Sequence, residues 1–214
     1  MGEIEFKRGR GVVYRATTYD TPLWVSPNSR PGRWNHPEDG TIAQYCTLDV
    51  ASAMAEMVRH ENLREIDEAR ELRVSVWELR VDEGAIADYS TPEAATRQGV
   101  SWSSLVSDSW SDCQAEGRRI LAEGGRGVVA PSAAFPRGIT LTLFGPRTEI
   151  AWGVEPSLSI QVPARHILHG APGAGLVRDT RFFDDPYPEV EPGSADNLFN
   201  FALTAEATRR GQLP

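Results

Sequence analysis

The sequence predicts an α+β fold with a mixed β core and flanking helices. Short runs of β-branched and apolar residues, which are typical of strands, stand beside longer segments with helical spacing. These two kinds of segment do not alternate in a regular strand–helix–strand order, which argues against a purely parallel sheet. A hydrophobic fraction of 40% in 214 residues is sufficient for a packed core.

The first part of the chain predicts two short strands on either side of a long loop. Residues 11–17 are rich in β-branched and aromatic residues, and residues 42–48 form a second strand-like run. Between them, residues 20–41 contain four prolines, so we expect a loop. Long loops in compact domains often carry functional residues.

A helix is expected over about residues 50–65. Asp49 can cap its first turn, because an aspartate side chain accepts hydrogen bonds from the free N–H groups there. Glu56 lies off the apolar face of this helix, so its carboxylate points either into a site or into water. The apolar residues that share one face are Ala51, Met54, Ala55 and Val58.

The remainder of the chain predicts further strands and helices and a C-terminal extension. Residues 84–112 are expected to form a loop with a short helix, followed by a helix over about 112–123. Three prolines and four acidic residues between positions 184 and 194 are typical of a linker. We therefore expect a catalytic domain over residues 1–183, and a linker and tail over residues 184–214, with a helix or a loose tail at about 195–210. The further strands are expected at 72–81, 128–130, 139–144 and 158–162.

The charge balance argues against direct binding to nucleic acid. The net charge is −8, whereas phosphate-backbone binding requires a surplus of basic residues on one face. Of the 22 basic residues, Lys7 is the sole lysine and the other 21 are arginine. Arginine suits bidentate phosphate contacts, although genomic base composition alone explains such an excess.

The cysteines and the N-terminal residues predict a cytoplasmic protein. Cys46 and Cys113 are far apart and form no CxxC pair, so neither a disulfide framework nor a zinc site is expected. The first residues lack the apolar core of a signal peptide. No apolar run is long enough to cross a bilayer, so we expect no membrane association.

Four polar residues in the first sixty positions form the main candidate site. Arg15 ends an apolar run, Arg33 lies in the loop, Tyr45 lies in the second strand and Glu56 lies on the helix. Two arginines can bind an anionic ligand, a tyrosine can hold an aromatic ring, and a carboxylate can stabilise a nearby cation. An enzyme that cleaves nicotinamide from NAD needs these groups.

Each candidate also has a purely structural interpretation. Arg15 could form an internal ion pair, Arg33 could be a loop surface residue, and Tyr45 could be a half-buried strand tyrosine. Glu56 could be a solvated glutamate, which is the commonest fate of this residue type. Ser132 could be an ordinary turn serine, since no GxSxG nucleophile elbow surrounds it.

No metal site is expected. His166 and His169 are three residues apart, and Glu56 and His60 are four apart on one helix. The histidine pair has no evident third ligand, which a zinc site would require. A helical salt bridge or plain exposure explains the Glu56–His60 pair better than a metal does.

Taken together, these residues resemble the RES domain family, which is named for an arginine, a glutamate and a serine. The three match Arg15, Glu56 and Ser132, and the likeness covers roughly residues 10–165. The Gly-Arg-Trp-Asn stretch at 32–35 is similar to the family's most recognisable short motif, and Tyr45 looks like its strand tyrosine.

The sequence departs from the family pattern at three places. Pro31 stands where the family usually has the first of two glycines. The run at 139–143 has none of the asparagines that the family tends to carry after the serine, and Gly145 precedes a proline where asparagine is usual.

The resemblance implies a fold similar to ADP-ribosyltransferases such as diphtheria toxin. It implies the toxin of a type II toxin–antitoxin system that depletes NAD by phosphorolysis or hydrolysis. The implied partner is an Xre-like helix-turn-helix antitoxin that blocks the active site. The alternatives are a mono-ADP-ribosyltransferase that modifies a protein, and a non-catalytic binding module with the same fold.

The resemblance also implies roles for individual residues. NAD is the substrate, no metal or further cofactor is needed, and inorganic phosphate is a candidate co-substrate; a homo-oligomer is left open. Glu56 would act on the ribose, Tyr45 would hold the nicotinamide, and Ser132 would assist catalysis and NAD binding. Arg15 and Arg33 would bind the phosphates of NAD, and Arg15 would also be catalytic. Trp34 and Asn35 are the further NAD-binding candidates in the loop.

Overall fold

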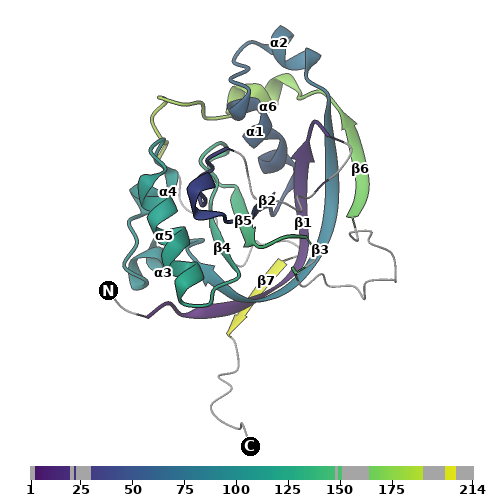
Figure 1. The fold of residues 1–214 in the computed structure, drawn as a ribbon. Helices are drawn as coiled ribbons and strands as arrows, with labels where there is room; N and C mark the ends of the chain where they lie inside the picture. Colours follow the sequence, from purple (N-terminus) through teal and green to yellow (C-terminus); the bar gives the residue numbers. More distant parts are fainter. Residues whose placement is uncertain are drawn as a thin grey trace, which may run out of the picture.

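The computed structural model describes residues 3–19, 22, 30–147, 149–150, 164–189 and 201–205. The strands in this part of the chain form one seven-stranded mixed sheet, and helices flank it (Figure 1), so the predicted α+β class with a mixed β core is confirmed. The strands are β1 (Phe6–Thr17), β2 (Ala43–Thr47), β3 (Val74–Asp88), β4 (Gly127–Pro131), β5 (Ile139–Phe144), β6 (Ala164–Gly170) and β7 (Phe201–Ala205). The helices are α1 (Val50–His60), α2 (Ile66–Glu71), α3 (Pro92–Arg97), α4 (Trp102–Val106), α5 (Ser111–Ala122) and α6 (Ala174–Asp179), with a 3-10 turn η1 (Pro37–Asp39).

The sheet closes on itself through its two longest strands. The strand order is β6-β3-β4-β5-β2-β1-β7, and β1 also pairs with β3 along almost its whole length. β3 and β4 are parallel, whereas the other pairs are antiparallel. The ring β1-β3-β4-β5-β2 surrounds an apolar core, because the inward positions of these strands carry aliphatic residues. Its buried residues include Val13, Leu79, Val129, Leu141 and Leu143.

Helix α1 begins where the sequence predicts and ends earlier. The Asp49 carboxylate accepts a hydrogen bond of 2.7 Å from the N–H of Ser52, which is the expected cap. The helix ends at His60 rather than at residue 65, because Asn62 adopts a left-handed conformation with φ of 52°. Met54, Ala55 and Val58 are buried as predicted, and Ala51 is partly exposed.

Strand β3 runs seven residues beyond the predicted end at 81, to Asp88. Two carboxylates of its second half form cross-strand ion pairs with β1. A strand prediction from sequence assigns such polar residues to a loop. The Arg8 guanidinium contacts Asp82 at 2.7 Å, and the Lys7 ammonium contacts Asp88 at 2.6 Å. Three helices, α3 to α5, occupy the following segment, where a loop with a short helix and one further helix were expected.

The C-terminal third contains elements that the sequence analysis missed. β6 and α6 were not predicted, and the expected strand at 158–162 lies outside the described residues. β7 pairs with β1 where a helix or a loose tail was expected. The short strand fits there because the Phe201 ring, 5% exposed, packs against Gly9, which has no side chain. The domain boundary at residue 184 stays a prediction.

The helices form two groups around the sheet. Figure 1 shows α3, α4 and α5 together on one side, and α1, α2 and α6 together at another end. The chain that follows α6 runs back toward α4 (Figure 1), so distant parts of the sequence meet near the C-terminal end of α1. Among the described residues, no helix combines the length and apolarity that crossing a bilayer requires.

Candidate active site

Glu56 and Ser132 lie in direct contact. Glu56 is half-buried on α1, and Ser132 directly follows β4 and is fully buried. The Ser132 hydroxyl donates a hydrogen bond of 2.7 Å to Glu56 Oε1. It also accepts hydrogen bonds from the N–H groups of Ala134 at 3.2 Å and Phe135 at 3.0 Å. Because these donors occupy its acceptor side, the hydroxyl hydrogen points at the carboxylate.

Arg15 lies on β1 beside Tyr45 and Cys46. Burial lowers the pKa of its guanidinium, while these two neighbours act in the opposite direction. In the described part of the chain, its hydrogen-bond acceptor is Gln44 Oε1 at 3.4 Å, and no carboxylate lies within ion-pair distance. A desolvated cation without a protein counter-ion is suited to an anionic ligand.

Tyr45 connects the Arg-Trp-Asn loop to the sheet. Its hydroxyl donates to Asn35 Oδ1 at 2.7 Å and accepts the N–H of Trp34 at 2.9 Å. Burial raises the tyrosine pKa, and Arg33 and Arg15 both oppose that rise, which places Tyr45 near both arginines. A Cβ on Gly32 would lie 2.4 Å from the Tyr45 hydroxyl oxygen, so the loop requires glycine here.

Trp34 and Asn35 are interior residues. Their exposed fractions are 2% and 1%, and the Trp34 ring lies 6.3 Å from the Tyr89 ring in the core beneath the helices. Gln114 of α5 donates to the carbonyls of Gly32 and Asn35. The two side chains therefore fix the shape of the loop that presents Arg33.

Arg33 is oriented by the end of α4. Its Nη1 donates to the carbonyl oxygens of Leu105 at 3.0 Å and Ser107 at 2.7 Å. Terminal helix carbonyls carry partial negative charge and hold a guanidinium well. No carboxylate among the described residues forms an ion pair with Arg33.

The structure adds a buried ionic cluster that the sequence analysis did not identify. Arg59, 3% exposed, donates to Asp108 Oδ1 at 2.5 Å and to the carbonyl of Ala133. Arg181 donates to the same Asp108 oxygen at 2.9 Å. Arg59 lies one helical turn after Glu56, which is a weak signal; nothing in the sequence links it to Asp108 or Arg181.

The pKa values in this cluster reflect shared charges. Burial lowers the pKa of Arg59; Arg181 and Arg33 add to that effect, and Glu56 and Asp108 oppose it. Burial alone would raise the pKa of Asp108, but the N–H of Asp184 and the Arg181 guanidinium bring it below its usual range. These couplings place Arg59 close to both Glu56 and Arg33.

Tyr187 contacts the same site from beyond α6. Its hydroxyl donates to the Ser132 carbonyl oxygen at 3.2 Å, and its side chain is half-buried. Burial raises the pKa of Tyr187 to about 12, with a smaller rise from Glu56, while Arg181, Arg33 and Arg59 lower it. The phenol is therefore neutral at physiological pH.

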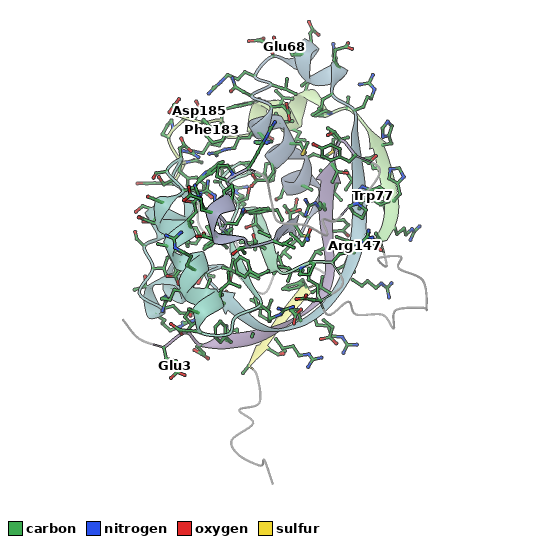
Figure 2. All side chains as sticks on the ribbon, in the orientation of Figure 1. Glu3, Glu68, Trp77, Arg147, Phe183 and Asp185 are labelled. Atoms are coloured by element: carbon green, nitrogen blue, oxygen red, sulfur yellow. The ribbon has the colours of Figure 1, made fainter. Side chains whose placement is uncertain are left out.

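The histidine pair lies elsewhere on the molecule. His166 and His169 lie on the exposed strand β6, where His166 contacts Trp77 edge-on at 5.0 Å and His169 contacts Ser75 (Trp77 is labelled in Figure 2). Within the described ranges, no three metal-ligating side chains converge.

The site residues thus form one connected region. Electrostatic couplings link Arg15 to Tyr45, Tyr45 to Arg33, and Arg59 to both Arg33 and Glu56. This region offers guanidinium groups for an anion and an oriented carboxylate for a positive centre.

Comparisons with known proteins identify the family and the fold of the chain. The RES domain family model matches residues 8–163. The curated proteins gave no match. Among solved structures, the chain is similar to one in the crystal structure of the M. tuberculosis MbcT–MbcA toxin–antitoxin complex, with a TM-score of 0.59 and 20% identity over 81% of this chain and 91% of that chain. That similarity shows a shared fold. Because the family match spans most of the chain and includes every residue of the candidate site from Arg15 to Ser132, the protein belongs to the RES domain family.

Proposed function

We propose that the protein is an enzyme that cleaves the bond between nicotinamide and ribose in NAD. One observation carries the proposal. The guanidinium groups of Arg15 and Arg33 lie near the same tyrosine without a carboxylate partner in the described part of the chain. Guanidinium groups that form no ion pair with the described residues are suited to the two phosphates of a dinucleotide.

The chemistry follows from the charge that the reaction develops. When the bond between the ribose C1 and the nicotinamide nitrogen breaks, its electron pair leaves with nicotinamide and the ribose becomes oxocarbenium-like. Glu56 would stabilise that cation or hold the ribose hydroxyls, with Ser132 fixing its carboxylate. Water, which then loses a proton, or inorganic phosphate would complete the reaction by adding to C1.

The wider biological role is proposed on the same basis. Membership of the RES domain family and the fold shared with a chain of a toxin–antitoxin complex support a toxin of a type II system with an ADP-ribosyltransferase-like fold. Its partner would be an Xre-like helix-turn-helix antitoxin that covers the active site in the cytoplasm. The net charge of −8 is consistent with DNA binding by the partner alone.

The fate of the ADP-ribose moiety tests this proposal. NAD labelled in its adenosine part would be incubated with the protein in buffer, in buffer with inorganic phosphate, and with a cell extract. Label in free ADP-ribose or in ADP-ribose phosphate would support the proposed function and identify the acceptor. Label on protein would support a mono-ADP-ribosyltransferase instead. Unchanged NAD in all three samples would indicate a binding module.

A further inference from the structure

The segment of residues 181–187, which we term the site strap, lies outside the stretch that matches the RES domain model. It nevertheless reaches Ser132 and the buried arginine cluster. We infer that Tyr187 of the site strap is a substrate-contacting residue, whose ring forms the wall beside Glu56 against which the nicotinamide–ribose end of NAD packs. This inference rests on the proposed function.

The site strap is held at both of its ends by the first part of the chain. The Asp108 carboxylate accepts the Arg181 guanidinium at 2.9 Å and the N–H of Asp184 at 2.7 Å. Arg64, just after α1, donates to Asp185 at 3.1 Å and to the carbonyl of Phe183 at 2.8 Å. Figure 2 labels Phe183 and Asp185, which lie near each other on the segment that runs from α6 toward α4. These contacts hold residues 181–185 in place without any contribution from a ligand.

The hydroxyl and the ring of Tyr187 have different surroundings. The hydroxyl donates a hydrogen bond to the backbone carbonyl of Ser132. The side chain of the same serine orients Glu56. The Arg181 guanidinium lies 5.7 Å from the ring centroid. Glu56, Arg33 and Arg59 are all close enough to influence the phenol. With the hydroxyl occupied, the half-buried ring is the part that can contact a ligand.

Tyr187 is better placed than Tyr45 for the contact with nicotinamide that the sequence analysis assigned to Tyr45. The Tyr45 hydroxyl is committed to Asn35 and to the Trp34 N–H, and Arg33 and Arg15 are the charged groups that act most strongly on it. The Tyr187 hydroxyl, in contrast, contacts the carbonyl of Ser132, the residue whose side chain contacts Glu56, and Glu56 contributes to the raised pKa of Tyr187. A flat aromatic wall beside the carboxylate would present the nicotinamide ribose to it in one orientation.

Two substitutions separate the ring from the hydroxyl. Tyr187→Phe keeps the ring and removes one hydrogen bond, whereas Tyr187→Leu removes the ring. The matched control is Tyr14→Leu. Tyr14 is also half-buried, but it packs against a different cluster, which contains Met54 of α1 and Val74 and Val76 of β3. Steady-state nicotinamide release and the melting temperature would be measured for each variant and for the wild type.

We expect KM for NAD to rise when the ring of Tyr187 is removed and to change little when only its hydroxyl is removed. Tyr187→Leu should raise KM for NAD about tenfold, as expected for loss of a stacking partner, and Tyr187→Phe should stay within about threefold because it costs one neutral hydrogen bond. Tyr14→Leu should lower the melting temperature without raising KM. An unchanged KM in folded Tyr187→Leu, or an equal rise in Tyr14→Leu, would overturn the inference while leaving the proposed function intact. Absence of Glu56-dependent release by the wild type would overturn both.

Discussion

The hydroxyl of Ser132 donates a 2.7 Å hydrogen bond to Oε1 of Glu56, and this pair joins the end of β4 to the middle of α1. The serine is fully buried and its oxygen already accepts hydrogen bonds from two backbone N–H groups, so its hydroxyl hydrogen points toward Glu56. Among the described residues, this hydrogen bond occupies one carboxylate oxygen of Glu56, and we expect a ligand to meet the other. Ser132 is thus a positioning residue in our account, acting through Glu56.

Replacing Ser132 with alanine should impair the reaction more than NAD binding. Without the hydroxyl, the carboxylate loses its fixed orientation, and misplacement of a reacting group by about 1 Å costs roughly 10²-fold in rate. We therefore expect kcat for nicotinamide release to fall by about two orders of magnitude, with KM changed much less. The two backbone N–H groups would lose their acceptor, so melting curves must show that the variant is folded. A parallel loss of NAD affinity in a folded variant would instead assign Ser132 to binding.

Replacing Arg15 with methionine should stabilise the free protein while weakening NAD binding. Arg15 is half-buried and its guanidinium is partly desolvated, without a carboxylate partner among the described residues. Replacing a desolvated charge by an apolar group of similar size is often neutral or stabilising, by about 1 kcal/mol. Loss of a charge-assisted phosphate contact should weaken NAD binding by roughly 10- to 100-fold. Calorimetric titration and thermal unfolding of the same sample measure both effects. Destabilisation with unchanged affinity would show that Arg15 is structural.

Replacing Asp108 with asparagine should destabilise the protein strongly. Arg59 and Arg181 would remain buried without their shared carboxylate, and breaking a buried pair costs about 3–5 kcal/mol. Chemical denaturation of the variant and the wild type at pH 7 would measure this loss.

The contribution of Asp108 should depend on pH in a defined direction. Because folding lowers the pKa of Asp108, its contribution is complete above the ordinary aspartate pKa and disappears as the pH falls through the lower folded value. The difference between the wild type and Asp108→Asn should therefore be constant near neutrality and shrink only in acid, below about pH 4. A difference that shrinks already between pH 8 and pH 6 would contradict this assignment.

Replacing Gly117 with alanine should displace the loop that carries Arg33. A Cβ at this position of α5 would lie 2.4 Å from the carbonyl oxygen of Trp34, and a backbone atom cannot move aside cheaply. We expect a loss of about 1–3 kcal/mol, typical of overpacking. Gly175→Ala in α6 is the matched control, since its Cβ would meet nothing within 4 Å. Equal unfolding free energies for the two variants would contradict the close packing of α5 on the loop.

The sequence predicts well those features that local chemistry determines. Asp49 marks the start of α1 because a capping carboxylate acts within three residues, and β5 coincides with its predicted range because its residues are buried between two neighbours. The Arg15, Glu56 and Ser132 candidates come from motif order. The structure brings Glu56 and Ser132 together, although 76 positions separate them.

The parts that could not be predicted depend on contacts distant in the sequence. Asp108 lies in a serine-rich segment typical of a loop, and only folding places it between Arg59 and Arg181. Tyr187 lies in a proline-rich acidic segment that looks like a linker. β7 has five residues and is defined by its pairing with β1, so local pattern cannot distinguish it from a helix or a tail.

Nicotinamide release from NAD by the wild type and by Glu56→Gln tests the central claim most directly. The substitution keeps one oxygen as a hydrogen-bond acceptor for Ser132, removes the negative charge and replaces the other oxygen by an NH2 donor of similar size, so the fold should be retained. Our account predicts release by the wild type and a fall of at least 10²-fold in the variant, with NAD still bound, as expected when charge stabilisation is lost. Equal release by both folded proteins, or none by the wild type, would contradict it.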